Sequence, residues 1–279
     1  MSPSFPRFDQ YHRLYVFVAL VTIASHFWVM RMRKCLIAGN WKLNGDHALC
    51  EQFASTEFPT DASLDIVICP PAVLLQSMHQ LVKKYSSCLH LGAQDVSVEA
   101  QGAYTGEISA KMLHEAGAQY GIIGHSERRA HFAETNEKVA TKMAQLLTAD
   151  VSPIICVGES REARDQQQTL TVIEAQLSLI KAVLQQQAVS CSQIVIGYEP
   201  LWAIGSEQPA TPEQAQQVHQ HIRKWMADVP EVDALRIIYG GSVTADNSAA
   251  LLAMPDIDGA LVGGAALNID SFLGLLPAV

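Results

Sequence analysis

Eight short apolar runs recur along residues 33–279, and this pattern constrains the fold more than any other feature. The runs are rich in isoleucine and valine and apolar at consecutive positions, which is typical of parallel strands covered on both faces. Segments with polar faces separate them and predict helices, most clearly over 136–148, 168–187 and 212–227, where Thr211 before Pro212 indicates a helix start. The runs are KCLIAGN (34–40), LDIVICP (64–70), LHLGAQ (89–94), QYGIIG (119–124), SPIICVG (152–158), QIVIGYE (193–199), LRIIYGG (235–241) and IDGALVGG (257–264).

The number and spacing of the runs favour an α/β fold of the (β/α)8 barrel type. Eight strand–helix units leave roughly 31 residues for each, which matches such a barrel. A doubly wound sheet is the alternative, but it more often has about five to seven strands and a glycine-rich first turn. The chain contains neither GxGxxG nor GxxxxGK[ST], so no dinucleotide or nucleotide phosphate loop is indicated.

The composition favours a protein that acts on a small metabolite. The 279-residue chain is 49% hydrophobic and carries a net charge of −9, which argues against the basic surface that nucleic acids and anionic membranes require. Its six cysteines form no CxxC pair and no cluster with histidine, so neither a zinc site nor a redox motif is indicated. We expect reduced, mostly buried thiols in a cytoplasmic protein.

The beginning of the chain carries a separate feature. Residues 14–30 form a nearly continuous apolar run with basic residues on both sides, at the short edge of what spans a membrane. The alternative is that Met30 or Met32 is the true start. We therefore divide the chain into an extension, residues 1–31, that is a misassigned start or a membrane-like segment, and a catalytic barrel, residues 32–279.

Polar residues and glycines accumulate where the predicted strands end. Catalytic residues of a (β/α)8 barrel come from the C-terminal ends of its strands, so these positions are the candidates for a site. They are Asn40 and Lys42 after the first strand, Gln94 after the third, His125 and Glu127 in GHSERR after the fourth, Glu199 after the sixth, Gly240, Gly241 and Ser242 after the seventh, and Gly263 and Gly264 after the eighth.

Each candidate alone also fits a structural explanation, such as a surface lysine, a capping histidine or a turn glycine. Together they indicate one site. The glycines and Ser242 after strands seven and eight lie where barrels often bind phosphate through backbone N–H groups, so we expect a phosphorylated small molecule. One carboxylate, one imidazole and one lysine without a set of metal ligands suggest proton transfer next to a carbonyl, with the carboxylate as base.

Six motifs, found in order with fitting spacing, make residues 32–279 resemble the triosephosphate isomerase family. The resemblance implies a TIM barrel that interconverts dihydroxyacetone phosphate and D-glyceraldehyde 3-phosphate through an enediolate, in glycolysis and gluconeogenesis, without a metal or cofactor. The motifs are AGNWK (38–42), GAYTGE (102–107), GHSERR (124–129), YEPLWAIG (198–205), YGGSV (239–243) and LVGGA (261–265).

The resemblance also implies a role for each candidate. Glu199 corresponds to the base, His125 to a neutral imidazole that polarises the carbonyl oxygens, and Lys42 to a positive charge near the substrate. A neutral His125 is physically reasonable because it opens a segment that can begin a helix, whose N-terminal partial charge disfavours a protonated ring. Glu127 corresponds to a buried glutamate near Lys42 that organises charge. The remaining substrate contacts are Asn40, which donates a hydrogen bond, and the phosphate-binding positions Gly205, Ser242, Gly263 and Gly264.

A homodimer is implied as well, in which the GAYTGE loop with Thr105 enters the neighbour and braces its asparagine and lysine.

The sequence departs from the family pattern in two places. Residues 206–208 read Ser206, Glu207 and Gln208 where the family usually has Thr-Gly-Lys, which puts in question how fast the loop over the site opens. Asp95 stands where the family usually has asparagine, close to the expected subunit contact.

Two other functions fit parts of the pattern. Another phosphate-binding barrel, such as an aldolase, would need a lysine for a Schiff base at a later strand end, and none of strands five to eight ends in one. A membrane-tethered binding or scaffold protein could use residues 14–30 as its anchor. The intact set of Asn40, Lys42, His125 and Glu199 argues against a barrel that has lost catalysis.

Overall fold

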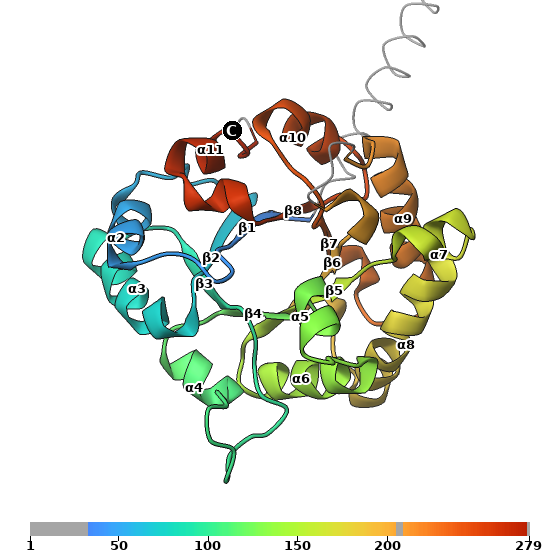
Figure 1. Ribbon diagram of the computed structural model, residues 1–279, viewed down its shortest axis with the longest axis horizontal. Coiled ribbons are helices and arrows are strands. Elements are labelled where there is room, and N and C mark those ends of the chain that lie inside the picture. Colours follow the sequence, from blue (N-terminus) through green and yellow to red (C-terminus); the bar gives the residue numbers. More distant parts are fainter. Residues whose placement is uncertain (1–32, 205–208, 278–279) are drawn as a thin grey trace, which may run out of the picture. The chain divides into compact units, whose positions relative to one another are not determined.

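The computed structural model describes residues 33–204 and 209–277. In these residues eight parallel strands pair in chain order, and β8 returns to β1 to close a barrel (Figure 1). This confirms the predicted (β/α)8 barrel and excludes the doubly wound sheet. The strands are β1 Cys35–Asn40, β2 Leu64–Cys69, β3 His90–Ala93, β4 Tyr120–Ile123, β5 Ser152–Val157, β6 Val195–Tyr198, β7 Arg236–Tyr239 and β8 Gly259–Val262.

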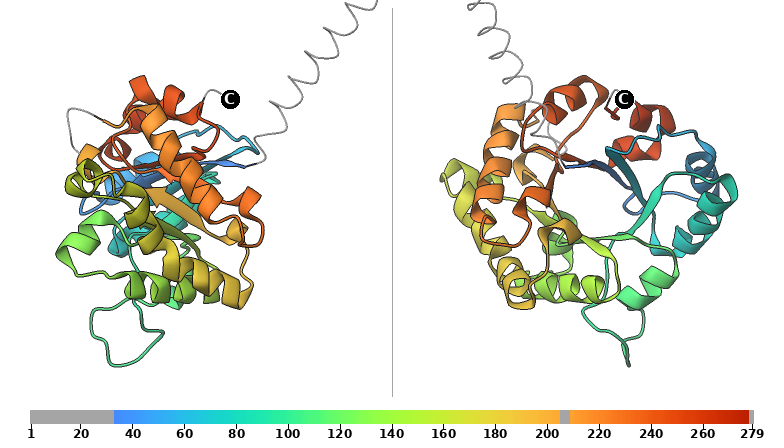
Figure 2. Two further views of the ribbon diagram at one scale, coloured as in Figure 1. Left: turned by 90° about the vertical axis from the view of Figure 1, so that its right-hand side faces the viewer. Right: turned by 180° about the vertical axis from the view of Figure 1, so that it is seen from behind.

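The helices lie around the outside of the barrel, as the views in Figures 1 and 2 show. The three helices expected most clearly are present as α6, α8 and α9, with bounds within two residues of those predicted. The α-helices are α2 His47–Ser55, α3 Ala72–Tyr85, α4 Ala110–Glu115, α5 Ser126–His131, α6 Asn136–Thr148, α7 Arg161–Asp165, α8 Thr169–Gln187, α9 Pro212–Trp225, α10 Ala245–Leu252 and α11 Ile269–Leu273, and the 3₁₀ turns are η1 Cys191–Gln193, η2 Leu201–Ala203, η3 Val232–Ala234 and η4 Gly264–Leu267.

The strands are apolar at consecutive positions because both of their faces are covered. In β1, Leu36 and Ala38 belong to a buried cluster drawn from the strands alone, which fills the barrel interior. Ile37 between them belongs to the larger cluster, which packs the strands against the helices. A fully buried isoleucine contributes about 2 kcal/mol, so both layers stabilise the barrel.

The polar-faced segments become helices whose apolar side faces the strands. In α6, Val139, Met143 and Leu146 are buried one helical turn apart. The start of α9 follows the sequence prediction, because the Thr211 side chain accepts from the Gln214 N–H and Pro212 occupies the first turn. These helices hold the strand ends, and therefore the loops beyond them, in fixed positions.

The loop between β3 and α4 projects away from the barrel in all three views (Figures 1 and 2). Every residue from 100 to 108 is exposed, including Thr105. An ordered loop that reaches into solvent is unusual unless it binds something.

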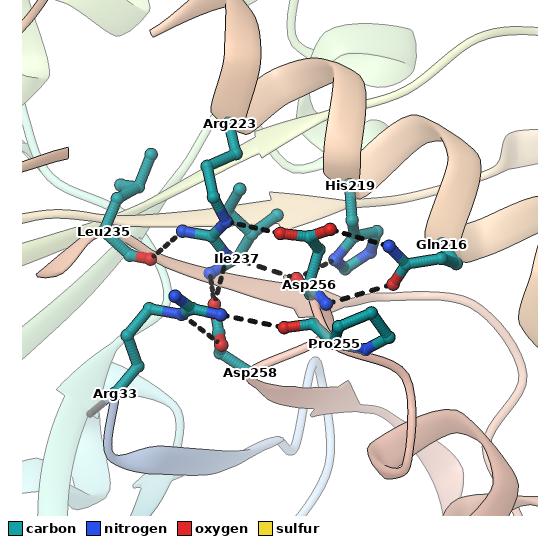
Figure 3. A network of polar contacts seen from close by, with 9 residues as sticks. All are labelled: Arg33, Gln216, His219, Arg223, Leu235, Ile237, Pro255, Asp256 and Asp258. Carbon is teal, nitrogen blue, oxygen red and sulfur yellow. Dashed lines mark hydrogen bonds and ion pairs between the residues drawn. The ribbon is translucent and has the colours of Figure 1, made fainter. Parts of the chain in front are cut away.

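Ion pairs close the N-terminal end of the barrel. Figure 3 shows one group, in which Asp258, just before β8, accepts from Arg33 Nε at 2.6 Å, Arg223 Nη2 at 2.8 Å and the Ile237 N–H at 2.9 Å. Arg223 also pairs with Asp256, whose other carboxylate oxygen accepts from Gln216. Because Arg33, Ile237 and Asp258 belong to the starts of β1, β7 and β8, the network joins neighbouring strands at their N-terminal ends.

Several expectations concern residues outside the described part of the chain. These are the apolar run 14–30, the phosphate-binding Gly205 and the altered positions Ser206, Glu207 and Gln208. Among the helices that the structure does describe, none combines the length and the apolar character needed to cross a membrane.

Candidate active site

The candidate residues meet in one cavity of about 410 Å³ at the C-terminal end of the barrel. Its walls come from the ends of β1, β6, β7 and β8 and from the loop after β4. Of the predicted site residues, Asn40, Lys42, His125, Glu199, Ser242, Gly263 and Gly264 all line it. A larger cavity of about 710 Å³ adjoins it, shares Asn40, Lys42 and His125, and has Glu127 in its wall.

Glu199 follows β6 directly and is almost completely buried. One carboxylate oxygen accepts the Ser126 backbone N–H at 2.9 Å, and the other lies 3.1 Å from His125 Nε2. Burial raises the pKa of the Glu199 carboxyl because the ionised form loses its hydration, and this outweighs the opposing effects of His125, the Ser126 N–H and Lys42. A buried carboxylate with a raised pKa is suited to accept a proton.

His125 caps the N-terminus of α5 with its ring. Its Nδ1 accepts the Glu127 backbone N–H at 3.3 Å, an arrangement that places the hydrogen of a neutral ring on Nε2. The Glu127 carboxylate is 3.8 Å from Nδ1, too far for a hydrogen bond. Nε2–H therefore points toward Glu199 and the cavity as a neutral donor.

Lys42 is held by its backbone in a strained position. Its φ of +53° is in the left-handed region, which costs about 1 kcal/mol for a residue other than glycine. Two contacts hold it there: the Lys42 N–H donates to Asn40 Oδ1 at 3.0 Å, and Gln94 Nε2 donates to the Lys42 carbonyl at 2.9 Å. This conformation aims the ammonium group at the cavity.

The Lys42 ammonium pairs with Glu127 at 2.6 Å. Burial opposes ionisation of Glu127, but Lys42 holds the pKa of the Glu127 carboxyl below its ordinary value. The predicted proximity of these residues is confirmed, but the prediction that Glu127 is buried is wrong. Its side chain is 48% exposed, because the first turn of α5 places it in the wall of the larger, open cavity.

Because glycine has no side chain, the backbone at two positions approaches the Glu199 and Lys42 side chains closely. A Cβ on Gly240 would lie 2.8 Å from Glu199 Cγ, and one on Gly263 would lie 3.3 Å from Lys42 Cε. Ser242 and Gly264 continue the same wall. Only small residues here leave room for a ligand beside Glu199 and Lys42.

Two groups at the site were not among the candidates at the strand ends, whereas Gln94, which follows the third strand, was. The Ser126 N–H binds Glu199, and Ile204 forms part of the cavity wall. The Gln94 amide braces Lys42. The Ser126 contact is made by a backbone atom, for which the residue type gives no signal. Ile204 belongs to an apolar loop segment that directly follows Glu199 and Pro200, and this was the available clue.

Asp95 completes a partly buried ring of charges beside the larger cavity. Its carboxylate pairs with Lys142 at 2.6 Å and Arg128 at 2.7 Å, and both cations also contact Glu134. Burial raises the pKa of the Asp95 carboxyl despite these partners. An asparagine could not supply the second negative charge of this ring.

The arrangement can perform general base chemistry on a small anionic substrate. Glu199 offers a proton acceptor, His125 a neutral N–H donor, and Lys42 a positive charge, all facing one cavity. The donors can stabilise negative charge that develops on a substrate oxygen, where a water-poor site strengthens them. The glycine wall leaves space for a further anionic group.

Comparison with known proteins identifies relatives of the chain. Residues 35–279 match the family model described as triosephosphate isomerase. The triosephosphate isomerase of Shewanella denitrificans is 45% identical over 257 residues, covering 88% of this chain and 97% of the relative. Those of Shewanella baltica and Shewanella frigidimarina are 44% and 43% identical with the same coverage.

Proposed function

The chain belongs to the triosephosphate isomerase family and interconverts dihydroxyacetone phosphate and D-glyceraldehyde 3-phosphate, and we propose that Glu199 is the base of this reaction. The reaction is a step of glycolysis and gluconeogenesis. The observation that carries the assignment is the buried Glu199 carboxylate, with its raised pKa, 3.1 Å from His125 Nε2 in a cavity lined by Lys42.

In this mechanism Glu199 removes a proton from the carbon next to the carbonyl, and the electron pair of the C–H bond forms the enediolate. His125 Nε2–H donates to the oxygen on which negative charge develops, and Lys42 lowers the energy of that charge. His125 gives its Nε2 proton to the former carbonyl oxygen and takes up the proton of the neighbouring hydroxyl, whose oxygen becomes the new carbonyl. Glu199 returns its proton to the former carbonyl carbon, so that no group is consumed. Asn40 donates a further hydrogen bond to the substrate, and Glu127 orients Lys42 through their ion pair.

The phosphate site in this proposal comprises Ser242, Gly263 and Gly264, with Gly205 as a fourth member outside the described residues. Support comes from the position of the first three in the wall of the cavity that Glu199 also lines. Backbone N–H groups that no side chain shields can approach phosphate oxygens closely.

The test of the base is a coupled assay of glyceraldehyde 3-phosphate isomerisation with the purified protein and a Glu199→Asp variant. Shortening the side chain withdraws the carboxylate by about 1 Å, which we expect to lower kcat by about 10²-fold. Glu213→Asp, on the exposed first turn of α9, makes the same chemical change away from the site and is expected to keep parental activity. An inactive parent, or a Glu199→Asp enzyme as fast as the parent, would disprove the assignment.

A homodimer with exchanged loops is also proposed. The larger cavity presents exposed apolar side chains, among them Leu43 and Phe132, and lies beside the projecting loop 100–108. Apolar exposure of this extent is typical of a surface that another chain covers. Insertion of the partner's loop, with its Thr105, would cover Leu43 and the half-exposed Glu127 and would brace Asn40 and Lys42.

The dimer is tested by sedimentation equilibrium. Thr105→Arg enlarges the tip of the loop and adds a charge, so this variant is expected to be monomeric at micromolar concentration and less active. Thr171→Arg places the same residue on the exposed face of α8 and is expected to remain dimeric. A parent that sediments as a monomer would contradict the proposal.

Two further expectations complete the proposed function. We propose a cytoplasmic location, since the substrate is an intermediate of glycolysis and the long helices of the described residues show no membrane span. We also propose that residues 32–279 form the catalytic domain by themselves. Fractionation of cells with an antibody to the barrel tests the first, and a truncation described below tests the second.

A further inference from the structure

The turn η2 connects the base to one wall of the substrate cavity. It comprises Leu201–Ala203 and follows Glu199 and Pro200 without interruption. Ile204, the next residue, lines the same cavity as Glu199. Any displacement of η2 therefore moves an apolar wall of the site.

Trp202 is the residue of this turn that the rest of the molecule holds. Its Nε1–H donates to Glu159 Oε1 at 2.8 Å, and the guanidinium of Arg164 lies 4.2 Å from the ring centroid. Arg164 is itself bound to Glu159 at 3.1 Å, and Tyr198 donates to the same oxygen. These groups form one interlocked cluster, in which the effect of any member on Trp202 cannot be separated from its effect on the others.

Arg161, the first residue of α7, contacts Trp202 differently. Its Nη2 donates to the Trp202 carbonyl at 3.2 Å, and its guanidinium lies 5.1 Å from the centroid of the indole ring. Within the described part of the chain, both of its polar contacts are made with this one residue. The side chain is exposed and takes no part in the core.

We propose that Arg161 is a positioning residue for the isomerase reaction: it fixes Trp202 at both its backbone and its ring, and so holds η2 and Ile204 beside Glu199. The inference rests on the proposed function of Glu199. Arg161 touches no reacting group, and its contribution is to reduce the freedom that the loop must lose when substrate binds.

Removing Arg161 is expected to loosen this turn without unfolding the protein. α7 keeps its cap, because the Ser160 hydroxyl accepts the Ala163 N–H at 3.1 Å. An exposed cation–π contact changes a local equilibrium by about two- to fivefold. The effect should be confined to the residues that follow Glu199.

The experiment measures amide hydrogen exchange of the full chain in a peptide that covers residues 200–204. Arg161→Met keeps an unbranched apolar stem but loses the guanidinium with its charge and donors, and should speed exchange in this peptide by about two- to fivefold. Arg161→Lys keeps the charge and should restore part of the protection. The matched control is Glu162→Gln, a substitution at the next residue of α7, whose side chain contacts only Gln166 among the described residues.

The kinetic readout separates positioning from chemistry. In Arg161→Met the KM for glyceraldehyde 3-phosphate should rise by about two- to fivefold while kcat stays within about twofold of the parent. Unchanged exchange at 200–204, or faster exchange spread over the whole barrel, would overturn the inference. An inactive parent would refute the proposed function, whereas the exchange result would still decide whether Arg161 holds the turn.

Discussion

The carboxylates at the two ends of the barrel have opposite surroundings. At the N-terminal end, Asp65 in β2 pairs with Lys34 at 2.6 Å and, across the barrel mouth, with Arg236 at 2.8 Å. Burial opposes its ionisation, but His90, Lys34 and Arg236 together hold the pKa of the Asp65 carboxyl well below its ordinary value. At the C-terminal end, Glu199 faces the His125 imidazole and one backbone N–H, and burial raises its pKa.

This difference in partners and pKa distinguishes buried carboxylates that stabilise the fold from the one that takes part in the reaction. Asp258 at the N-terminal end has three donors, two of them arginines, and its charge is compensated (Figure 3). Glu199 has no cation in direct contact among the described residues. A carboxylate that is costly to keep ionised is poised to take a proton, whereas a compensated one is not.

The largest expected effect comes from replacing the base. Glu199→Gln removes the proton acceptor but keeps the size of the side chain, and we expect kcat to fall by about 10³-fold or more. The free energy of unfolding should stay equal or rise, because a poorly compensated buried charge has been removed. Steady-state kinetics and urea unfolding of the same preparation measure both quantities. A substantial loss of stability would contradict the comparison.

The converse substitution is Asp258→Ala at the N-terminal end. It leaves Arg33 without its carboxylate partner and Arg223 with Asp256 alone, and should lower the free energy of unfolding by about 3 kcal/mol. The folded fraction should keep nearly parental kcat, since the site lies at the other end. Asp228→Ala, which breaks an exposed pair with Lys181, is the control and should leave the urea midpoint almost unchanged. Equal losses in both variants would argue against a special role for the Asp258 network.

Activity and stability should be lost at different pH values, because they depend on carboxylates at opposite ends of the barrel. Because Glu199 must be ionised to act and its pKa is raised in the free protein, kcat/KM should fall on acidification with a midpoint above 4.5, the ordinary glutamate value. Asp65 has a depressed folded pKa, so its contribution to stability is present above 3.8 and is lost only as the pH falls through the lower folded value. Near pH 5, activity should therefore decline while the circular dichroism signal persists. Simultaneous loss of both would contradict this expectation.

The smallest effect is expected from deletion of residues 1–31. Arg33 remains in the truncated chain and keeps its contacts with Asp258 and the Pro255 carbonyl, so β1 stays fixed at its start. We expect unchanged kcat and KM in the coupled assay. Loss of turnover on truncation would show that the extension contributes to the working enzyme.

The features that depend on a local pattern of residue types could be predicted from the sequence. The consecutive apolar residues of the strands, the start of α9 at Thr211 and Pro212, and the position of Glu199 at the end of β6 were all expected, and the structure has them. The catalytic candidates could be predicted because closure of the barrel brings the ends of the strands together, whichever side chains the strands carry.

Contacts that join distant segments through specific atoms could not be predicted in this way. Arg161 and Trp202 are 41 positions apart, and Asp95 and Lys142 are 47 positions apart. Each is an ordinary polar or aromatic residue in its own segment, and its partner is set by how α6 and α7 pack on the barrel. The exposure of Glu127 has the same origin, since it depends on the open cavity beside α5.

The most direct test of the contrast between the two ends is a carbon-13 NMR titration of the side-chain carboxyls. Protein labelled at the carboxyl carbons of glutamate and aspartate would be titrated, with Glu199→Gln and Asp65→Asn spectra used for assignment. We predict that Glu199 titrates above 4.5 and that Asp65 stays ionised well below 3.8 in the folded protein. A Glu199 midpoint at or below 4.5, or an Asp65 midpoint at or above 3.8, would contradict the account.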